Sequence, residues 1–457
     1  MTMQKTAKGF LRGLAAVMAA ALAATALSGC QSGEGGGASE PTEVVKVGLL
    51  PELELGSRQM TVLSQSSGED LKELDEDMKE LYGLEIEFIS VQWASLGEKI
   101  TQLVLGGTPP DIYYSRMRDF PLLPKKNILQ PLDEILDFSL PIYAGTEEVR
   151  KDTMYNGQTY ASCTQASVPN VMWYNEKLFR EAALDTPRQY LERDEWNWNT
   201  MLTLAQELTD EAEGRYGLAM GRNTDLRMTT GKDVIMFDEQ GNPQQQLNDK
   251  DILATMDFWN ELGLGRYKVM SPELNPTELF KQGKIGMMVG GSYLVSQFAD
   301  MSQSNEVNFV PFPKYPDADD YYNWGTYTSL SIPRGAQNIN AARAFIYAFQ
   351  YMSSAYYVDI SDDEFLTQRV AQEKERKTTN YGYDEEDFAM EEFMRTNVKC
   401  NLNPAERVNG YTDYFDWVVA QTVRNEGTAY QTVLAEHEPW LQDFVDTYNK
   451  EVLGISE

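Results

Sequence analysis

The sequence predicts an α/β fold in which helices flank a mainly parallel sheet. Some segments alternate apolar and polar residues or are wholly apolar, which is typical of strands. Between them lie segments whose apolar residues recur at helical spacing. The chain has 457 residues, of which 42% are hydrophobic, so it can form two or three domains with a sizeable core. This composition excludes a largely disordered chain.

The alternation is clearest in the first third of the chain. The sequence predicts three strands, at 60–63, 84–91 and 112–114. The two helices predicted between them cover 71–81 and 96–104. Strands joined by helices in this order pair in parallel. Ligands of such sheets lie beyond the carboxyl ends of the strands, which here are the loops 64–68, 92–95 and 115–119.

The remainder of the chain continues the pattern. Further strands are predicted at 171–174, 285–289 and 328–332, and further helices at 201–208, 251–262 and 341–351. The C-terminal part is predicted to be mostly helical. Four tryptophans at helical positions are assigned to the hydrophobic core: Trp198, Trp259, Trp417 and Trp440.

Charge and histidine content argue against several functions. Lys and Arg number 39 against 70 Asp and Glu, a formal net charge of −31. Such a chain is not expected to bind nucleic acid, because neutralising phosphates needs clustered cations. His437 is the single histidine, which excludes a multi-histidine metal site and disfavours a Ser-His-Asp hydrolase. No phosphate loop or dinucleotide fingerprint occurs, and neither a metal nor a cofactor is predicted.

The N-terminus has the features of an export signal. Three basic residues precede an apolar segment over 14–27 that is too short to span a bilayer comfortably. The segment ends in Leu-Ser-Gly-Cys, which resembles the bacterial lipobox and implies diacylglycerol on the thiol of Cys30. Residues 1–29 are then a lipoprotein signal peptide, and residues 30–43 a flexible stalk rich in Gly, Ser and Glu. An ordinary signal with an incidental cysteine is the alternative.

Three segments are distinctive in combination. They read ITQLVLGGTPPDI at 100–112, VMWYNEKLFREAAL at 171–184 and FKQGKIGMMVGGSY at 280–293. In this order they resemble the extracellular solute-binding protein family 1, the sugar-binding partners of bacterial ABC importers. Trp173 departs from the aliphatic residue that the family usually has there. The similarity runs from about Met60 to about Met352, and the rest of the chain matches only as a helical tail.

The resemblance implies a two-lobed periplasmic-binding-protein-like fold of type II. Each lobe would be a mainly parallel sheet flanked by helices, with a hinged cleft between the lobes. Lobe one would comprise 44–166 and 327–395, and lobe two 167–326 and 396–457. The implied function is to capture a carbohydrate, such as an oligosaccharide, by lobe closure and to deliver it to the membrane permease. With Cys30 acylated, the protein is expected as a monomer on the outer face of the cytoplasmic membrane.

A carbohydrate site needs aromatic rings for the apolar face of the sugar and polar groups for its hydroxyls. The aromatic candidates lie near predicted strand ends or the hinge, and are Tyr293, Trp324, Tyr327 and Trp93. Tyr293 is the strongest, because the resemblance places it where the family has a sugar-stacking ring. The remaining candidates are Gln92, Ser115, Arg118, Asn170 and Ser67, with Tyr411 reaching from the tail. Core packing or ion pairing is the alternative role for these residues.

Two other functions stay open at this point. A binding protein of the same fold could take a peptide, a polyamine or another cationic solute, which the acidic composition favours. A secreted glycan hydrolase is a more remote alternative, because the abundant carboxylates could include a catalytic pair. Pairing of Cys163 with Cys400 is also open, since export permits a disulfide.

Overall fold

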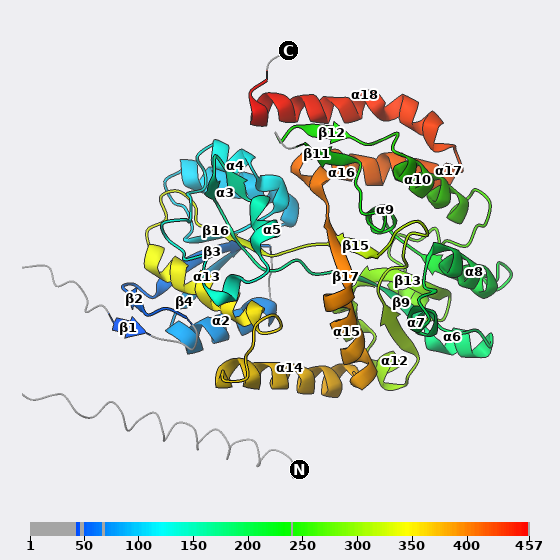
Figure 1. The fold of residues 1–457 in the computed structure, drawn as a ribbon, viewed down its shortest axis with the longest axis horizontal. Coiled ribbons are helices and arrows are strands. Elements are labelled where there is room, and N and C mark those ends of the chain that lie inside the picture. The colour runs from blue at the N-terminus through cyan, green and yellow to red at the C-terminus, as the bar shows by residue number, and fades with distance from the viewer. Residues whose placement is uncertain (1–42, 46–49, 66–68, 239–240, 456–457) are drawn as a thin grey trace, which may run out of the picture. The chain divides into compact units, whose positions relative to one another are not determined.

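The computed structural model describes residues 43–45, 50–65, 69–238 and 241–455 (Figure 1). The predicted signal peptide, most of the predicted stalk, Cys30 and the candidate Ser67 lie outside these residues. In the described part of the chain, no helix combines the length and the hydropathy that crossing a bilayer requires.

The first sheet confirms the predicted alternation of strands and helices. Its strand order is β4 (Glu85–Ser90), β3 (Gln59–Ser64), β5 (Ile112–Ser115), β16 (Ser329–Ser331) and β8 (Ser162–Cys163). β3 pairs in parallel with both β4 and β5, and the connecting helices are α2 (Glu69–Tyr82) and α3 (Leu96–Leu105). The carboxyl ends of these three strands therefore meet at one edge of lobe one.

Neither sheet is mainly parallel as predicted, because β16 of the first sheet is antiparallel to both β5 and β8. The second sheet, which forms lobe two, departs further from the prediction. Its order is β10 (Tyr216–Ala219), β13 (Ile285–Gly291), β9 (Asn170–Asn175) and β14 (Val307–Val310). β10 and β13 are parallel, whereas β9 is antiparallel to both of its neighbours, so this sheet is not mainly parallel. β9 enters directly from lobe one, without the crossover helix that a parallel connection needs.

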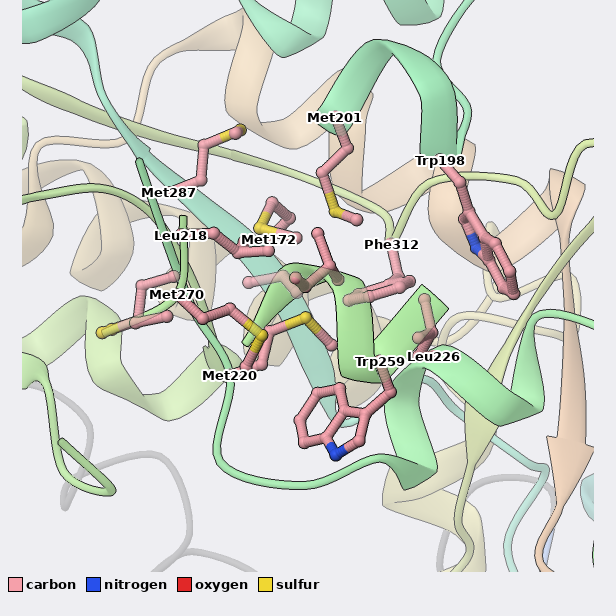
Figure 2. Packing of buried hydrophobic residues seen from close by; sticks show 14 of the residues in the cluster. Met172, Trp198, Met201, Leu218, Met220, Leu226, Trp259, Met270, Met287 and Phe312 are labelled. Atoms are coloured by element: carbon pink, nitrogen blue, oxygen red, sulfur yellow. The ribbon is translucent and has the colours of Figure 1, made fainter. Parts of the chain in front are cut away.

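Each sheet has its own hydrophobic core. In lobe two, Met172 and Met287 of the sheet belong to one buried cluster with Met201 of α8 (Trp198–Leu208) and Trp259 of α10 (Lys250–Leu262) (Figure 2). Clusters of lobe one cover the other sheet and include Phe345 of α13 (Ile339–Ser354). Burying a large apolar side chain contributes about 1.5–3 kcal/mol, so these apolar stripes hold the helices against the sheets.

The four tryptophans assigned to the core fall into two groups. Trp198 and Trp259 are buried, as predicted, whereas Trp417 and Trp440 are exposed, so the prediction was wrong for them. Trp417 lies in a π-helical turn, η7 (Phe415–Ala420), whose buried side chains include Asp416 and Val419. Trp440 lies outside the buried stripe of α18 (Tyr430–Tyr448). Helical spacing alone does not tell which face of a helix meets the core.

The C-terminal residues mostly join lobe two. β17 (Val398–Leu402) pairs in parallel with β15 (Tyr321–Gly325), and α15 (Glu385–Asn397) and α18 contribute to the core of lobe two. α14 (Glu364–Tyr381) connects the two cores, because its Leu366 is buried in lobe one and its Tyr381 packs against lobe two (Figure 1). The boundaries between the lobes, including the one near residue 395, stay a prediction.

Candidate functional site

The carboxyl edge of the first sheet presents an exposed tryptophan. The 3-10 turn η2 (Trp93–Ser95) follows β4, and Trp93 is 42% exposed, with exposed Gln92 beside it. The buried guanidinium of Arg116 donates to the Trp93 carbonyl over 2.5 Å and lies 5.3 Å from the centre of its ring. Asp119 accepts from the same guanidinium at 2.8 Å. The loops after β4 and β5 are thereby joined, which holds Trp93 at this edge.

Arg118 links this edge to lobe two. It lies in η3 (Met117–Asp119), and 14% of its side chain is exposed. Its Nη1 is 3.3 Å from Oδ2 of Asp413, while its Nε is buried without a hydrogen-bond partner. Burial raises the pKa of the nearby Glu406 carboxyl, and the charges of Arg118 and Arg222 oppose that rise. A free guanidinium N–H in this position can donate to a bound hydroxyl or carboxylate.

The second sheet contributes the end of β13 and the start of β9. Asn170 lies opposite Gly291, the last residue of β13, and its Nδ2 donates to Oδ1 of Asp225 over 2.8 Å. Tyr293 follows in η5 (Ser292–Gln297) and is 72% exposed. A tyrosine with this exposure takes no part in a hydrophobic core, so its ring is available to a ligand.

Asp225 is a buried carboxyl at the same edge. It lies in α9 (Thr224–Met228) and is 7% exposed. Burial raises its pKa to about 6, although the hydrogen bond from Asn170 and the charge of Arg222 both favour the ionised form. Its carboxyl therefore changes between a hydrogen-bond donor and a pure acceptor at a pH close to neutrality.

Asp225, Arg222 and Trp417 belong to this region but were not among the predicted site residues. The guanidinium of Arg222 lies 5.2 Å from the centre of the Trp417 ring, and Trp417 is 40% exposed. Arg222 and Asp225 follow β10, so the strand-end rule would have found them if residues 216–219 had been predicted as a strand. Trp417 had no comparable signal, because its helical setting favoured core packing.

A buried ionic cluster stabilises the segments that carry the site. It consists of Arg227, Asp233 and Asp416. Arg227 Nε lies 2.9 Å from Asp233 Oδ1, and its Nη1 lies 3.0 Å from Asp416 Oδ1. Asp233 Oδ2 also accepts from the backbone N–H of Ala405 at 3.1 Å, and Asp416 accepts from the hydroxyl of Thr224. Because Glu406 and Trp417 directly follow residues of this network, the cluster determines where both are held.

Ser115 and Tyr411 were predicted as ligand contacts, but their polar groups are occupied inside the protein. The Ser115 hydroxyl is 2.9 Å from that of Ser329 and 3.0 Å from that of Ser331, within the first sheet. Tyr411 is fully buried, and its hydroxyl donates to Gln245 over 2.8 Å. We correct the prediction by leaving both residues out of the candidate site.

Trp324 and Tyr327 lie where the chain returns from lobe two to lobe one. Trp324 is half-buried on β15, opposite Asn401 of β17. Tyr327 packs against the core of lobe one, and its hydroxyl is buried without a hydrogen-bond partner. A buried hydroxyl of this kind costs free energy unless a ligand or water satisfies it, so Tyr327 stays a candidate.

A cavity of about 370 Å³ lies beside the segment that leads into β9. Its lining includes Ser167 of that segment, Trp173 and Ser292 of lobe two, and Cys400, which is a free thiol like Cys163. Ser292 directly precedes Tyr293 in the chain, but the Tyr293 ring is not part of the cavity lining. Small-molecule pockets have volumes of about 300–1,000 Å³, and this cavity falls within that range.

The arrangement offers aromatic rings, amide, carboxyl and guanidinium groups from both sheet edges. Among the described residues, no group of three or more His, Cys, Asp and Glu side chains could hold a metal ion. Such a set of side chains can recognise a polar organic molecule that has an apolar face.

The chain is similar in sequence to a known protein family and to curated relatives. The profile of the bacterial extracellular solute-binding protein family matches residues 64–365. A curated Escherichia coli K12 protein named as an ABC transporter periplasmic-binding protein, YcjN, is 18% identical over 281 residues, which is 59% of this chain and 62% of the relative. The chain thus matches less than two thirds of that relative's length.

Two solved structures share the fold at low identity. The ABC substrate-binding protein Lmo0181 of Listeria monocytogenes, in complex with cycloalternan, has a TM-score of 0.62 at 16% identity, covering 87% of this chain and 99% of that one. The GacH receptor of Streptomyces glaucescens, solved unliganded and with acarbose, has a TM-score of 0.60 at 17% identity, with the same coverage of 87% and 99%.

Proposed function

This chain belongs to the bacterial extracellular solute-binding protein family, and we propose that it captures a carbohydrate for an ABC importer. The observation that carries the proposal is the presence of three exposed aromatic residues, Trp93, Tyr293 and Trp417, beside buried polar groups. Aromatic rings stack on the apolar face of a sugar, and carboxyl, amide and guanidinium groups bond to its hydroxyls. Cycloalternan and acarbose in the two similar structures support a ligand of this class.

In the proposed mechanism, binding itself is the signal and no bond of the ligand is made or broken. Trp93 and Arg118 come from lobe one, whereas Asn170, Tyr293 and Trp417 come from lobe two. A ligand that contacts both sets favours the closed arrangement of the lobes, because its contacts are complete only there. The closed form then presents a surface to the permease that the open form lacks.

Replacing Tyr293 by alanine is expected to weaken carbohydrate binding about ten-fold or more, since the loss of a stacked ring costs roughly 1–2 kcal/mol and about 1.4 kcal/mol is a factor of ten. The ligand is first found by thermal shift with a panel that includes maltotriose, cycloalternan and acarbose, and the affinity is then measured by calorimetric titration. The melting temperature should change little, because Tyr293 is mostly exposed.

The matched control is Trp440→Ala, which removes an exposed ring from the face of α18 that lies outside the core. This variant should bind the sugar as the unchanged protein does. If Tyr293→Ala also binds normally, or melts much earlier, the ring is not a ligand contact. If no carbohydrate of the panel raises the melting temperature, the carbohydrate proposal itself is wrong.

A cationic solute such as a polyamine is the second candidate. The observation that favours it is the group of carboxyls at the site, Asp225, Glu406 and Asp413, of which Asp225 is buried and Glu406 is half-buried. Arg118 and Arg222 offset this negative charge, which is why the carbohydrate is preferred. Spermidine in the same panel decides between the two, because it should raise the melting temperature only if the carboxyls dominate the site.

The lipid anchor is also part of the proposal. Cys30 follows an export signal in a lipobox-like sequence, and two acyl chains on one cysteine hold a protein stably on a membrane. Cys30→Ala is expected to move the protein from the membrane fraction into the medium, measured by fractionating expressing bacteria. A variant that stays in the membrane fraction would contradict the anchoring through Cys30.

A further inference from the structure

Two lysines of lobe one hold the C-terminal turn of lobe two. Lys125 ends α4 (Leu122–Lys125), which follows the site turn η3 in the chain, and Lys126 comes next. Lys125 Nζ donates to the backbone carbonyls of Glu451 at 2.8 Å and Val452 at 2.7 Å. Lys126 Nζ lies 3.4 Å from Oε2 of Glu451. The contacts therefore join segments that are more than 300 residues apart.

The position of Lys125 has a clear physical basis. α18 continues into a π-helical turn, η8 (Asn449–Leu453), which ends at Gly454 in the left-handed conformation. The last carbonyls of a helix have no partner within it and carry partial negative charge, so a lysine ammonium is a favourable partner. Val452 belongs to the core of lobe two, which means that the turn is anchored there and Lys125 attaches it to lobe one.

Two further ion pairs cross between the same parts of the molecule. Arg118 of lobe one pairs with Asp413, and Asp152 of lobe one lies 3.9 Å from Arg407. We call the contacts of Arg118, Lys125 and Lys126 with Asp413 and the turn η8 the ionic latch. The latch begins at Arg118, which is itself a candidate site residue, and extends away from the site along α4.

We propose that Lys125 and Lys126 are positioning residues that keep the two lobes together over the candidate site without touching a ligand. The link to ligand binding rests on the proposed function, whereas the effect on the lobes does not. The protein carries a formal net charge of −31, so its lobes repel each other on average. Placing two cations of lobe one against the carbonyls and the carboxylate of η8 opposes that repulsion at the point of contact.

A charge swap tests the latch without any ligand. Spin labels on cysteines introduced at exposed Glu98 of α3 and exposed Glu436 of α18, in a Cys400→Ala background, report the distance between the lobes by pulsed electron resonance. Lys126→Glu should move molecules to longer distances and lower the ratio of closed to open forms by about two- to five-fold, as expected when the attraction at an exposed pair becomes repulsion. Lys125→Met, which removes the donor to both carbonyls, should act in the same direction.

A double variant that restores the ion pair distinguishes the loss of a latch from a general loss of structure. The double variant Lys126→Glu with Glu451→Lys re-forms the pair in the opposite sense and should return the short distance. Lys281→Glu is the matched control, because Lys281 pairs with Glu278 inside one helix of lobe two, so the distance should stay unchanged. Unchanged distances in Lys126→Glu and Lys125→Met, or a swap that fails to restore the short distance, would overturn the proposal. No sugar enters the experiment, so its result is independent of the carbohydrate screen.

Discussion

Replacing Arg227 by alanine is expected to lower the free energy of unfolding by about 3–5 kcal/mol, because it leaves two buried carboxylates without their cation. Arg227 and Asp233 are fully buried, and Asp416 is nearly so. Burial already raises the pKa of Asp233, and the charge of Arg227 is the largest influence that opposes this rise. Without the guanidinium, either a charge stays desolvated or a proton must be taken up, and both destabilise the folded state.

The size of this effect distinguishes a buried pair from an exposed one. Arg193 pairs with Asp185 and Glu195 at 3.1 Å each, at the surface. Arg193→Ala should therefore cost less than about 1 kcal/mol. Urea unfolding of both variants and the unchanged protein provides the comparison. Equal losses for Arg227→Ala and Arg193→Ala would show that the buried ionic cluster does not stabilise lobe two.

The same substitution should also disturb the candidate site. The cluster connects α9 to Ala405 and to η7, so its loss releases the segments that carry Glu406 and Trp417. Tryptophan fluorescence of the unchanged protein and of folded Arg227→Ala, each compared with the same protein carrying Trp417→Phe, isolates the change at Trp417. An unchanged contribution from Trp417 would mean that its position is independent of the cluster.

The local part of the fold was predictable from the sequence because local patterns determine it. The spacing of apolar residues predicts the alternation from β3 to β5, and Tyr293 lies two residues after the end of an apolar strand. Pairing direction is different, since β9 has the same pattern whether it runs parallel or antiparallel to β13. The reversed direction of β9 follows from where the chain enters lobe two, which no single segment encodes.

The candidate site was only partly predictable for the same reason. Asp225 is buried by residues far along the chain and bonds to Asn170, which lies 55 positions earlier. Tyr411 was mistaken for a ligand contact because its partner Gln245 lies 166 positions away. Contacts over such separations depend on tertiary packing, so sequence spacing gave no sign of them. Exposed rings at strand ends are easier to predict, because the strand that places them is a local feature.

Replacing Asp225 by asparagine is expected to stabilise the protein near pH 7.5 and to have little effect near pH 4. The pKa of Asp225 is raised by burial from 3.8 to about 6, so the folded state holds a proton that the unfolded state has lost between these values. Stability from this group is therefore fully present below about pH 4 and is lost as the pH rises through about 6. Asparagine carries no charge at any of these pH values and can still accept from Asn170.

The expected difference at pH 7.5 is roughly 2–3 kcal/mol in favour of Asp225→Asn, since each pKa unit corresponds to about 1.4 kcal/mol. Urea unfolding of the variant and the unchanged protein at pH 4 and pH 7.5 measures it, and subtracting the two proteins removes the contribution of other titrating groups. Asp137→Asn is the control of opposite sign, because hydrogen bonds from Ser139 lower the pKa of that exposed carboxyl. Replacing Asp137 by asparagine should lower the free energy of unfolding slightly at pH 7.5, because the hydrogen bonds from Ser139 favour its ionised form. A variant of Asp225 that is no more stable than the unchanged protein at pH 7.5 would show that this carboxylate is already well solvated, and that the edge of lobe two is open to water around it.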